Sequence, residues 1–169
     1  MSGAIAIEAA CDGDGDAIAA LIAAVFADYP DCPFDRAAEF RELDAVASHF
    51  AELGGRIWVA RPCGPKTGTE TGVTGCLGIH PTSEPGVWEI KKVYVSKDAR
   101  GGGIAGRMHA EALAFAAERG AAEVRLWTDI RFTEGHRFYE AKGYDRVAVV
   151  RALADLGRTW EYAYRRRLP

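Results

Sequence analysis

The chain has 169 residues, of which 49% are hydrophobic and 27% are charged. We therefore expect one ordinary globular domain spanning residues 1–169. The 21 basic and 24 acidic residues give a formal net charge of −3, which argues against a nucleic-acid-binding protein. The sequence shows no signal-peptide pattern, no membrane-spanning run and no metal or disulfide spacing among its four cysteines, so we expect a cytoplasmic protein without a metal.

The first predicted elements in chain order are a strand and two helices. Residues 4–9 are apolar enough for a short strand, and Asp14 or Asp16 can cap a helix over residues 17–28. A second helix is predicted over residues 36–53. Each helix has an apolar stripe, formed by Ile18, Leu21, Ile22, Val25 and Phe26 in the first and by Phe40, Leu43, Val46, Ala47 and Phe50 in the second.

The loop between these helices, residues 28–35, combines three carboxylates with two aromatic rings. A solvated loop explains the carboxylates as well as a ligand-binding loop does. In the second interpretation Asp31 attracts a cationic amine, and Tyr29 or Phe34 packs against the carbon skeleton of that amine. These three residues are the candidate substrate-binding residues.

Three strands are predicted next. Residues 56–61 and 73–79 form two of them, joined by a hairpin loop at residues 62–71 that is rich in proline, glycine and threonine. The β-branched and aromatic residues of 88–95 predict the central strand. Strict alternation places Trp88, Ile90 and Tyr94 on one face of this strand and Glu89, Val93 and Val95 on the other.

Three consecutive glycines, Gly101, Gly102 and Gly103, stand between the central strand and an amphipathic helix. The helix is predicted from apolar residues at helical spacing, Ile104, Met108, Ala112 and Phe115. It should end near Gly120, a residue suited to a left-handed cap. The N–H groups at a helix N-terminus lack partners and carry partial positive charge, so this loop predicts a site for a phosphate or pyrophosphate.

The spacing distinguishes between families that use such a loop. A dinucleotide-binding loop places its first glycine directly after the strand, whereas residues 96–100 intervene here, and no Gly-Lys-Ser/Thr follows. The run Arg100-Gly101-Gly102-Gly103-Ile104-Ala105 resembles the acetyl-CoA-binding motif of the GNAT superfamily of N-acetyltransferases. The resemblance covers most of residues 56–144, including a segment at 133–144 that is similar to the family's aromatic-Tyr-Glu-x-x-Gly-aromatic signature.

The resemblance implies an α/β domain of GNAT fold, with a mixed sheet of six to seven strands and about four helices. Acetyl-CoA would be the cosubstrate. Its pantetheine arm would contact the main chain of Val95, and the Val93 amide would face the acetyl carbonyl as an oxyanion donor. The pyrophosphate would lie against the loop and helix start formed by Arg100, Gly101, Gly102, Gly103, Ile104, Ala105 and Gly106.

Two further residues are candidates for proton transfer. Tyr139 occupies the position of the family's frequent general acid, which protonates the departing CoA thiolate. Glu89, four residues before Val93, occupies the position of the general base of some members. Each has a competing structural role, namely core packing for Tyr139 and pairing with Lys91 for Glu89. Where many members have an asparagine, this chain has Phe132, so that hydrogen bond is absent or is replaced by Thr133 or Asp129.

The remaining strands are predicted over residues 123–129, 146–150 and 159–165. The predicted function is acetyl transfer from acetyl-CoA to a primary amine of a small molecule or peptide, by direct attack in a ternary complex. The alternative is a catalytically inactive sensor or partner module that binds acetyl-CoA or CoA. Exposed edge strands are compatible with a homodimer, and the sequence does not specify the acceptor amine.

Overall fold

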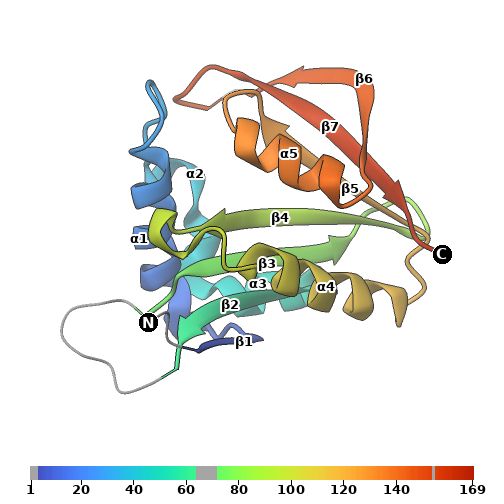
Figure 1. Ribbon diagram of the computed structural model, residues 1–169, viewed down its shortest axis with the longest axis horizontal. Coiled ribbons are helices and arrows are strands. Elements are labelled where there is room, and N and C mark those ends of the chain that lie inside the picture. The colour runs from blue at the N-terminus through green and yellow to red at the C-terminus, as the bar shows by residue number, and fades with distance from the viewer. Residues whose placement is uncertain (1–3, 64–71, 154) are drawn as a thin grey trace.

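A seven-stranded mixed sheet with helices on both faces organises the computed structural model, which describes residues 4–63, 72–153 and 155–169 (Figure 1). The strands are β1 (Ile5–Ala9), β2 (Arg56–Pro62), β3 (Gly75–Pro81), β4 (Val87–Val95), β5 (Glu123–Asp129), β6 (Asp145–Ala152) and β7 (Trp160–Arg167). In the described residues the α-helices are α1 (Gly15–Phe26), α2 (Arg36–Glu39), α3 (Val46–Glu52), α4 (Ile104–Ala117) and α5 (Thr133–Ala141). The fold class predicted from the sequence is confirmed. The expected hairpin loop at 62–71 lies outside the described residues from residue 64 onward.

Two apolar cores lie on opposite faces of the sheet. Helices α4 and α5 cover one face and helices α1 and α3 cover the other (Figure 1). Strand β2 contributes to both cores, with Trp58 packed on the α4 side and Ile57 and Val59 on the α1 side. A strand that is buried on both faces has an almost continuous apolar sequence, which is what residues 57–60 show. No helix in the described ranges is long and apolar enough to cross a membrane.

The strand order is β1-β2-β3-β4-β5-β7-β6, and among the described residues only β4 and β5 are paired in parallel. Their pairing covers the first part of each strand and ends at Ile90 and Leu126. Beyond these residues β4 and β5 diverge (Figure 1). The main chain of β4 after Ile90 therefore has no strand partner on the side that faces β5.

The predicted faces of β4 were partly wrong because the strand contains a β-bulge. Lys92 has a φ of 58°, and the register with β3 shifts between Cys76 and Gly78. One extra residue reverses the alternation of side chains along a strand. As a result Tyr94 packs on the α1 side of the sheet against Phe26, with ring centroids 5.9 Å apart. Val93 and Val95 lie instead on the α4 side, with Trp88 and Ile90.

The single helix expected over residues 36–53 is divided into α2, a 3₁₀ turn over Arg41–Ala45, and α3. Phe40 and Ala45 leave the helical region, with φ of −135° and −147°. The guanidinium of Arg36 bridges the carboxylates of Asp16 at 2.6 Å and Asp44 at 2.9 Å, which holds the segment in this folded-back form. The apolar stripe was nevertheless predicted well, since Phe40, Leu43, Val46 and Phe50 are buried while Ala47 is half-buried.

Candidate active site

Two cavities lie beside the diverging halves of β4 and β5. The first, which we call the α4 cavity, has a volume of about 470 Å³ and is lined by the end of β4, residues 99–101 and 103–106, and one side of α5. The second, the α2 cavity, has a volume of about 290 Å³ and is lined by parts of residues 32–40, of β4 and β5, and of the segment 155–161, together with Leu153. The residues that line both are Val93, Tyr94, Thr128, Phe132 and Tyr139. The cavities therefore meet between the two strands.

The glycine loop forms one end of the α4 cavity. Gly101 and Gly103 have φ of 79° and 74°, and a Cβ added to either would meet nothing within 4 Å. The left-handed backbone explains the need for glycine, and the open space lets a ligand approach the main chain. The first N–H groups of α4 have no partners within the helix, so the loop fits a phosphate group. Gly102 differs, because it has no positive φ and does not line the cavity.

Arg100 connects three elements at the same end of this cavity. Its Nε donates to the Val95 carbonyl at 3.2 Å, and its Nη1 donates to the Glu134 carboxylate at 2.9 Å. The guanidinium thus lies between the end of β4 and the first turn of α5. The Val95 carbonyl, a predicted pantetheine contact, is bonded to Arg100 in this structure.

Tyr139 extends from α5 to the place where the cavities meet. Its side chain is only 6% exposed and packs against the rings of Phe138, Tyr144 and Tyr164. Burial raises the pKa of the Tyr139 hydroxyl well above its ordinary value near 10. The phenol therefore stays protonated at neutral pH, and burial makes it a weaker acid than an exposed tyrosine.

Glu89 lines neither cavity. Its carboxylate lies 3.6 Å from the Lys91 ammonium, and it borders a separate depression together with Glu84 and Arg125. Alternation along β4 before the bulge puts Glu89 on the same face as Lys91, which does line the α2 cavity. The structure thus brings Val93 and Tyr139 together and leaves Glu89 farther along the strand.

The candidate substrate residues of the first loop are only partly brought to the site. Tyr29 lines the α4 cavity, and its ring lies 4.7 Å from that of Phe132. Asp31 is exposed, and its carbonyl accepts a hydrogen bond from Arg131. Phe34 stacks on Phe40 at 5.1 Å and lines neither cavity.

Several polar residues of the α2 cavity were not predicted from the sequence. They are Glu39, Arg131, Asp155 and Glu161, together with Asp129, which was considered only as a replacement for the family's asparagine. Arg131 donates to both carboxylate oxygens of Asp129, at 3.0 and 2.6 Å, so Asp129 is fully engaged. Phe132 packs its ring on Tyr29 and Phe26 and forms an apolar wall between the cavities. No local motif in the sequence connects these residues.

The divergence of two parallel strands beside a glycine loop defines the class of the protein, the GNAT-type acetyltransferases. The family model described as Acetyltransferase (GNAT) family matches residues 17–144, and the chain belongs to this family. Binding of acetyl-CoA is typical of the family.

Solved structures support the fold. An acetyltransferase of the GNAT family from Staphylococcus aureus Mu50 has a TM-score of 0.80 and 17% identity, covering 98% of this chain and 100% of its own. The yncA protein from Salmonella typhimurium, solved with its cofactor acetyl-CoA, has a TM-score of 0.74 and 18% identity, covering 99% of this chain and 95% of its own. At these identities the likeness shows the fold alone. A comparison with curated proteins gives no match.

Proposed function

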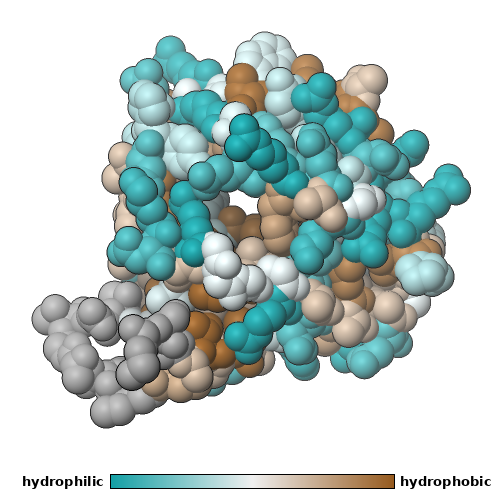
Figure 2. Space-filling model, viewed as in Figure 1, coloured by the Kyte–Doolittle hydropathy of each residue, from teal (hydrophilic) through white to brown (hydrophobic). Residues whose placement is uncertain are grey.

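We propose that the protein is an acetyl-CoA-dependent N-acetyltransferase that acts on a primary amine of a small molecule or peptide by direct transfer. The observation that carries this proposal is the meeting of the two cavities at Val93, Tyr94, Thr128, Phe132 and Tyr139. The space-filling view shows the molecule hollowed through its middle (Figure 2). Two ligands that enter past different elements can therefore contact each other there.

The α4 cavity would hold acetyl-CoA. Its pyrophosphate would lie against the N–H groups that begin α4, near Gly101 and Gly103, where positive dipole and open space coincide. Its pantetheine arm would pair with the main chain of β4 that β5 leaves free, as an added strand does. Arg100 would place a positive charge beside this path.

The chemistry then follows from the groups at the meeting point. The amine lone pair attacks the acetyl carbonyl carbon, and the C–S bond breaks. The N–H of Val93 would stabilise the negative charge that develops on the carbonyl oxygen. The departing thiolate would take a proton from Tyr139, and the attacking nitrogen would return one to Tyr139 as it becomes the amide nitrogen. The ammonium form of the acceptor must first lose a proton, and Glu89 could accept it only through bridging water, since it lines neither cavity.

The first test is thermal melting of the protein with acetyl-CoA, followed by measurement of CoA release with a panel of amines. Ligand at 100 times its dissociation constant should stabilise the fold by about 2.7 kcal/mol. A rise in melting temperature together with amine-dependent thiol release supports the proposal. The absence of any shift at millimolar acetyl-CoA would overturn it.

A second candidate function is an acetyl-CoA-binding sensor without turnover. The placement of Glu89 outside both cavities favours it, because the described residues then offer no direct general base at the predicted position. The same experiment separates the two functions. Stabilisation by acetyl-CoA without thiol release from any amine would support the sensor.

A further inference from the structure

The α2 cavity combines aromatic walls with charged groups, some of which have an ion-pair partner and some of which do not. Phe26, Phe40, Trp127 and Phe132 contribute rings to the lining. Burial of an aliphatic or aromatic carbon skeleton against such walls is favourable by about 25 cal/mol per Å² of apolar surface removed from water. The charged residues therefore decide which polar groups a ligand can carry at its ends.

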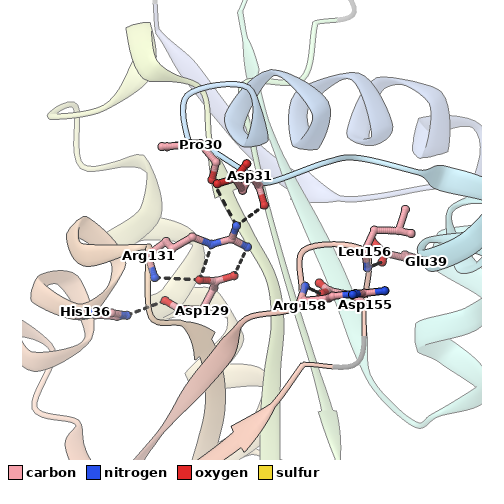
Figure 3. Close-up of polar contacts among 9 residues, drawn as sticks. All are labelled: Pro30, Asp31, Glu39, Asp129, Arg131, His136, Asp155, Leu156 and Arg158. Atoms are coloured by element: carbon pink, nitrogen blue, oxygen red, sulfur yellow. Dashed lines mark hydrogen bonds and ion pairs between the residues drawn. The ribbon is translucent and has the colours of Figure 1, made fainter.

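The cations of the cavity already have partners. The Arg131 guanidinium holds both oxygens of Asp129 and also donates to the Asp31 carbonyl (Figure 3). The Lys92 ammonium pairs with Glu42 and lies 4.4 Å from the centre of the Phe40 ring. Lys91 is paired with Glu89 at 3.6 Å and is largely exposed. An acidic ligand group would have to compete with an existing partner at each of these cations.

Two carboxylates of the cavity, in contrast, have no ion-pair partner among the described residues. Glu39 accepts one hydrogen bond from the Leu156 main chain at 2.7 Å, and Asp155 accepts one from the Arg158 main chain at 3.0 Å (Figure 3). A main-chain N–H satisfies one oxygen without forming an ion pair, and Arg131, the cation whose charge Asp155 feels, is already held by both oxygens of Asp129. Glu39 and Asp155 are both half-buried, so the cavity has an excess of negative charge on this side.

These two carboxylates lie away from the point where the cavities meet. Glu39 and Asp155 line the α2 cavity alone, whereas Val93 and Tyr139 line both cavities. A ligand that presents an amine to Val93 and Tyr139 can therefore extend its other end to Glu39 and Asp155. Between the two ends it passes the aromatic walls.

We propose that the acceptor is a compact diamine, with one primary amine at the meeting point and a second cationic nitrogen near Glu39 and Asp155. This inference rests on the proposed acetyltransferase function and narrows its substrate class. An acceptor with a carboxylate or phosphate at its far end would meet like charge, and like charges brought together are disfavoured. Free amino acids and other acidic amines are accordingly poor acceptors.

Three probes of equal length test the inference: 1,5-diaminopentane, 1-aminopentane and 5-aminopentanoate. They differ only in the far end, which is cationic, neutral or anionic. CoA release is measured with the full chain at saturating acetyl-CoA. We expect kcat/KM to fall about tenfold from the diamine to the monoamine, beyond the factor of two that two equivalent amines supply, and to fall again to the amino acid.

Charge-removing variants test whether the two carboxylates cause this preference. Glu39→Gln and Asp155→Asn keep an oxygen that can accept the Leu156 or Arg158 hydrogen bond while removing the charge. Each should lower the ratio of diamine to monoamine kcat/KM about three- to tenfold, through the KM of the diamine. Glu111→Gln, on the exposed face of α4, is the matched control and should leave the ratio unchanged. Melting temperatures identify any variant that has lost its fold.

The outcomes are distinguishable. Turnover of the monoamine or the amino acid as efficient as that of the diamine overturns the diamine assignment and leaves acetyl transfer standing. A diamine preference that both variants retain in full overturns the role of Glu39 and Asp155, and with it the inference. No thiol release from any of the three probes, while another amine of the panel is acetylated, overturns the diamine assignment alone. No release from the whole panel, with acetyl-CoA still stabilising the protein, overturns the proposed transferase as well.

Discussion

Arg100 and Glu134 form an ion pair at 2.9 Å that joins the loop before α4 to the first turn of α5. Both residues line the α4 cavity, so the pair lies beside the path proposed for acetyl-CoA. Glu134 is 64% exposed, which limits the strength of the pair. The phosphates of acetyl-CoA and the Glu134 carboxylate are thus both anions that can bind Arg100.

Removing the charge of Arg100 and removing that of Glu134 should therefore have opposite effects on the affinity for acetyl-CoA. Arg100→Gln should weaken binding about tenfold, since a cation beside the phosphates is lost. Glu134→Gln should strengthen binding about two- to fivefold, since a competing anion is removed. Isothermal titration calorimetry measures both dissociation constants. If both variants weaken binding equally, the pair acts as a structural link and the competition argument is wrong.

Alanine at the three loop glycines should distinguish Gly101 and Gly103, which have a left-handed backbone and line the α4 cavity, from Gly102, which does neither. Gly101→Ala and Gly103→Ala introduce a Cβ at φ of 79° and 74°, which should cost about 1 kcal/mol of unfolding free energy each and weaken acetyl-CoA binding. Gly102→Ala is the matched control, because Gly102 lacks a positive φ and does not line the α4 cavity. Urea unfolding and calorimetry give the two quantities. A Gly102→Ala protein as impaired as the other two would contradict the prediction.

Tyr139→Phe should reduce kcat about tenfold to a hundredfold, because the proton donor to the thiolate is lost. The ring that packs on Phe138 and Tyr164 is retained, so the melting temperature and the KM for acetyl-CoA should change little. Steady-state kinetics and thermal melting together distinguish the two roles of Tyr139. An unchanged kcat would show that this residue serves packing alone.

Protein stability should fall in mild acid because of His109. Its ring is buried and bonded to the Tyr144 hydroxyl at 3.0 Å, and burial, assisted by nearby Arg166 and Lys142, lowers the pKa of His109 to about 4. The unfolded chain binds a proton near pH 6.5 but the folded chain does not, so stability rises with pH across this interval. Between pH 6.5 and 4 the unfolding free energy should decrease by up to about 1.4 kcal/mol per pH unit.

The comparison for this prediction is His109→Gln, which keeps a polar group near Tyr144 and cannot take up a proton. Urea unfolding at a series of pH values should give a flatter curve for the variant between pH 6.5 and 4. The His109 contribution would be refuted by parallel curves for the two proteins.

Elements governed by local pattern could be predicted from the sequence. Strand β5 begins and ends at the expected residues 123 and 129, and α4 is followed by Gly120 with a φ of 81°. In both cases the residues themselves carry the signal, either as a short apolar strand or as helical periodicity with a glycine stop. The glycine loop was predictable for the same reason.

The faces of β4 could not be predicted, because a bulge depends on the partner strand. Lys92 adopts its left-handed φ where β3 changes register, between Cys76 and Gly78, and its ammonium is held by Glu42. Nothing in the order of residues from Trp88 to Val95 marks this position. Alternation is a sound guide only as far as the pairing is regular.

The α2 cavity could not be predicted for a different reason. Arg131 donates to the Pro30 carbonyl, a residue 101 positions away, and the lining comes from several separate segments. A sequence pattern gives information about residues that are close along the chain. The residues that line the α2 cavity are far apart in sequence and are brought together by the sheet. Of the first loop, Tyr29 lines the α4 cavity, whereas Asp31 contributes its carbonyl to Arg131 and its carboxylate is not part of the lining of the α2 cavity.

The meeting of two cavities that share five lining residues also bears on the order in which the two ligands bind. Because the glycine loop borders one cavity and residues 155–161 border the other, the two ligands of the proposed function would lie against different elements and would not block each other. Binding is then free to occur in either sequence, and each product can leave by the opening through which its precursor arrived. A random sequential rate law is the steady-state result expected of this architecture, with CoA competing against acetyl-CoA and the acetylated product competing against the amine.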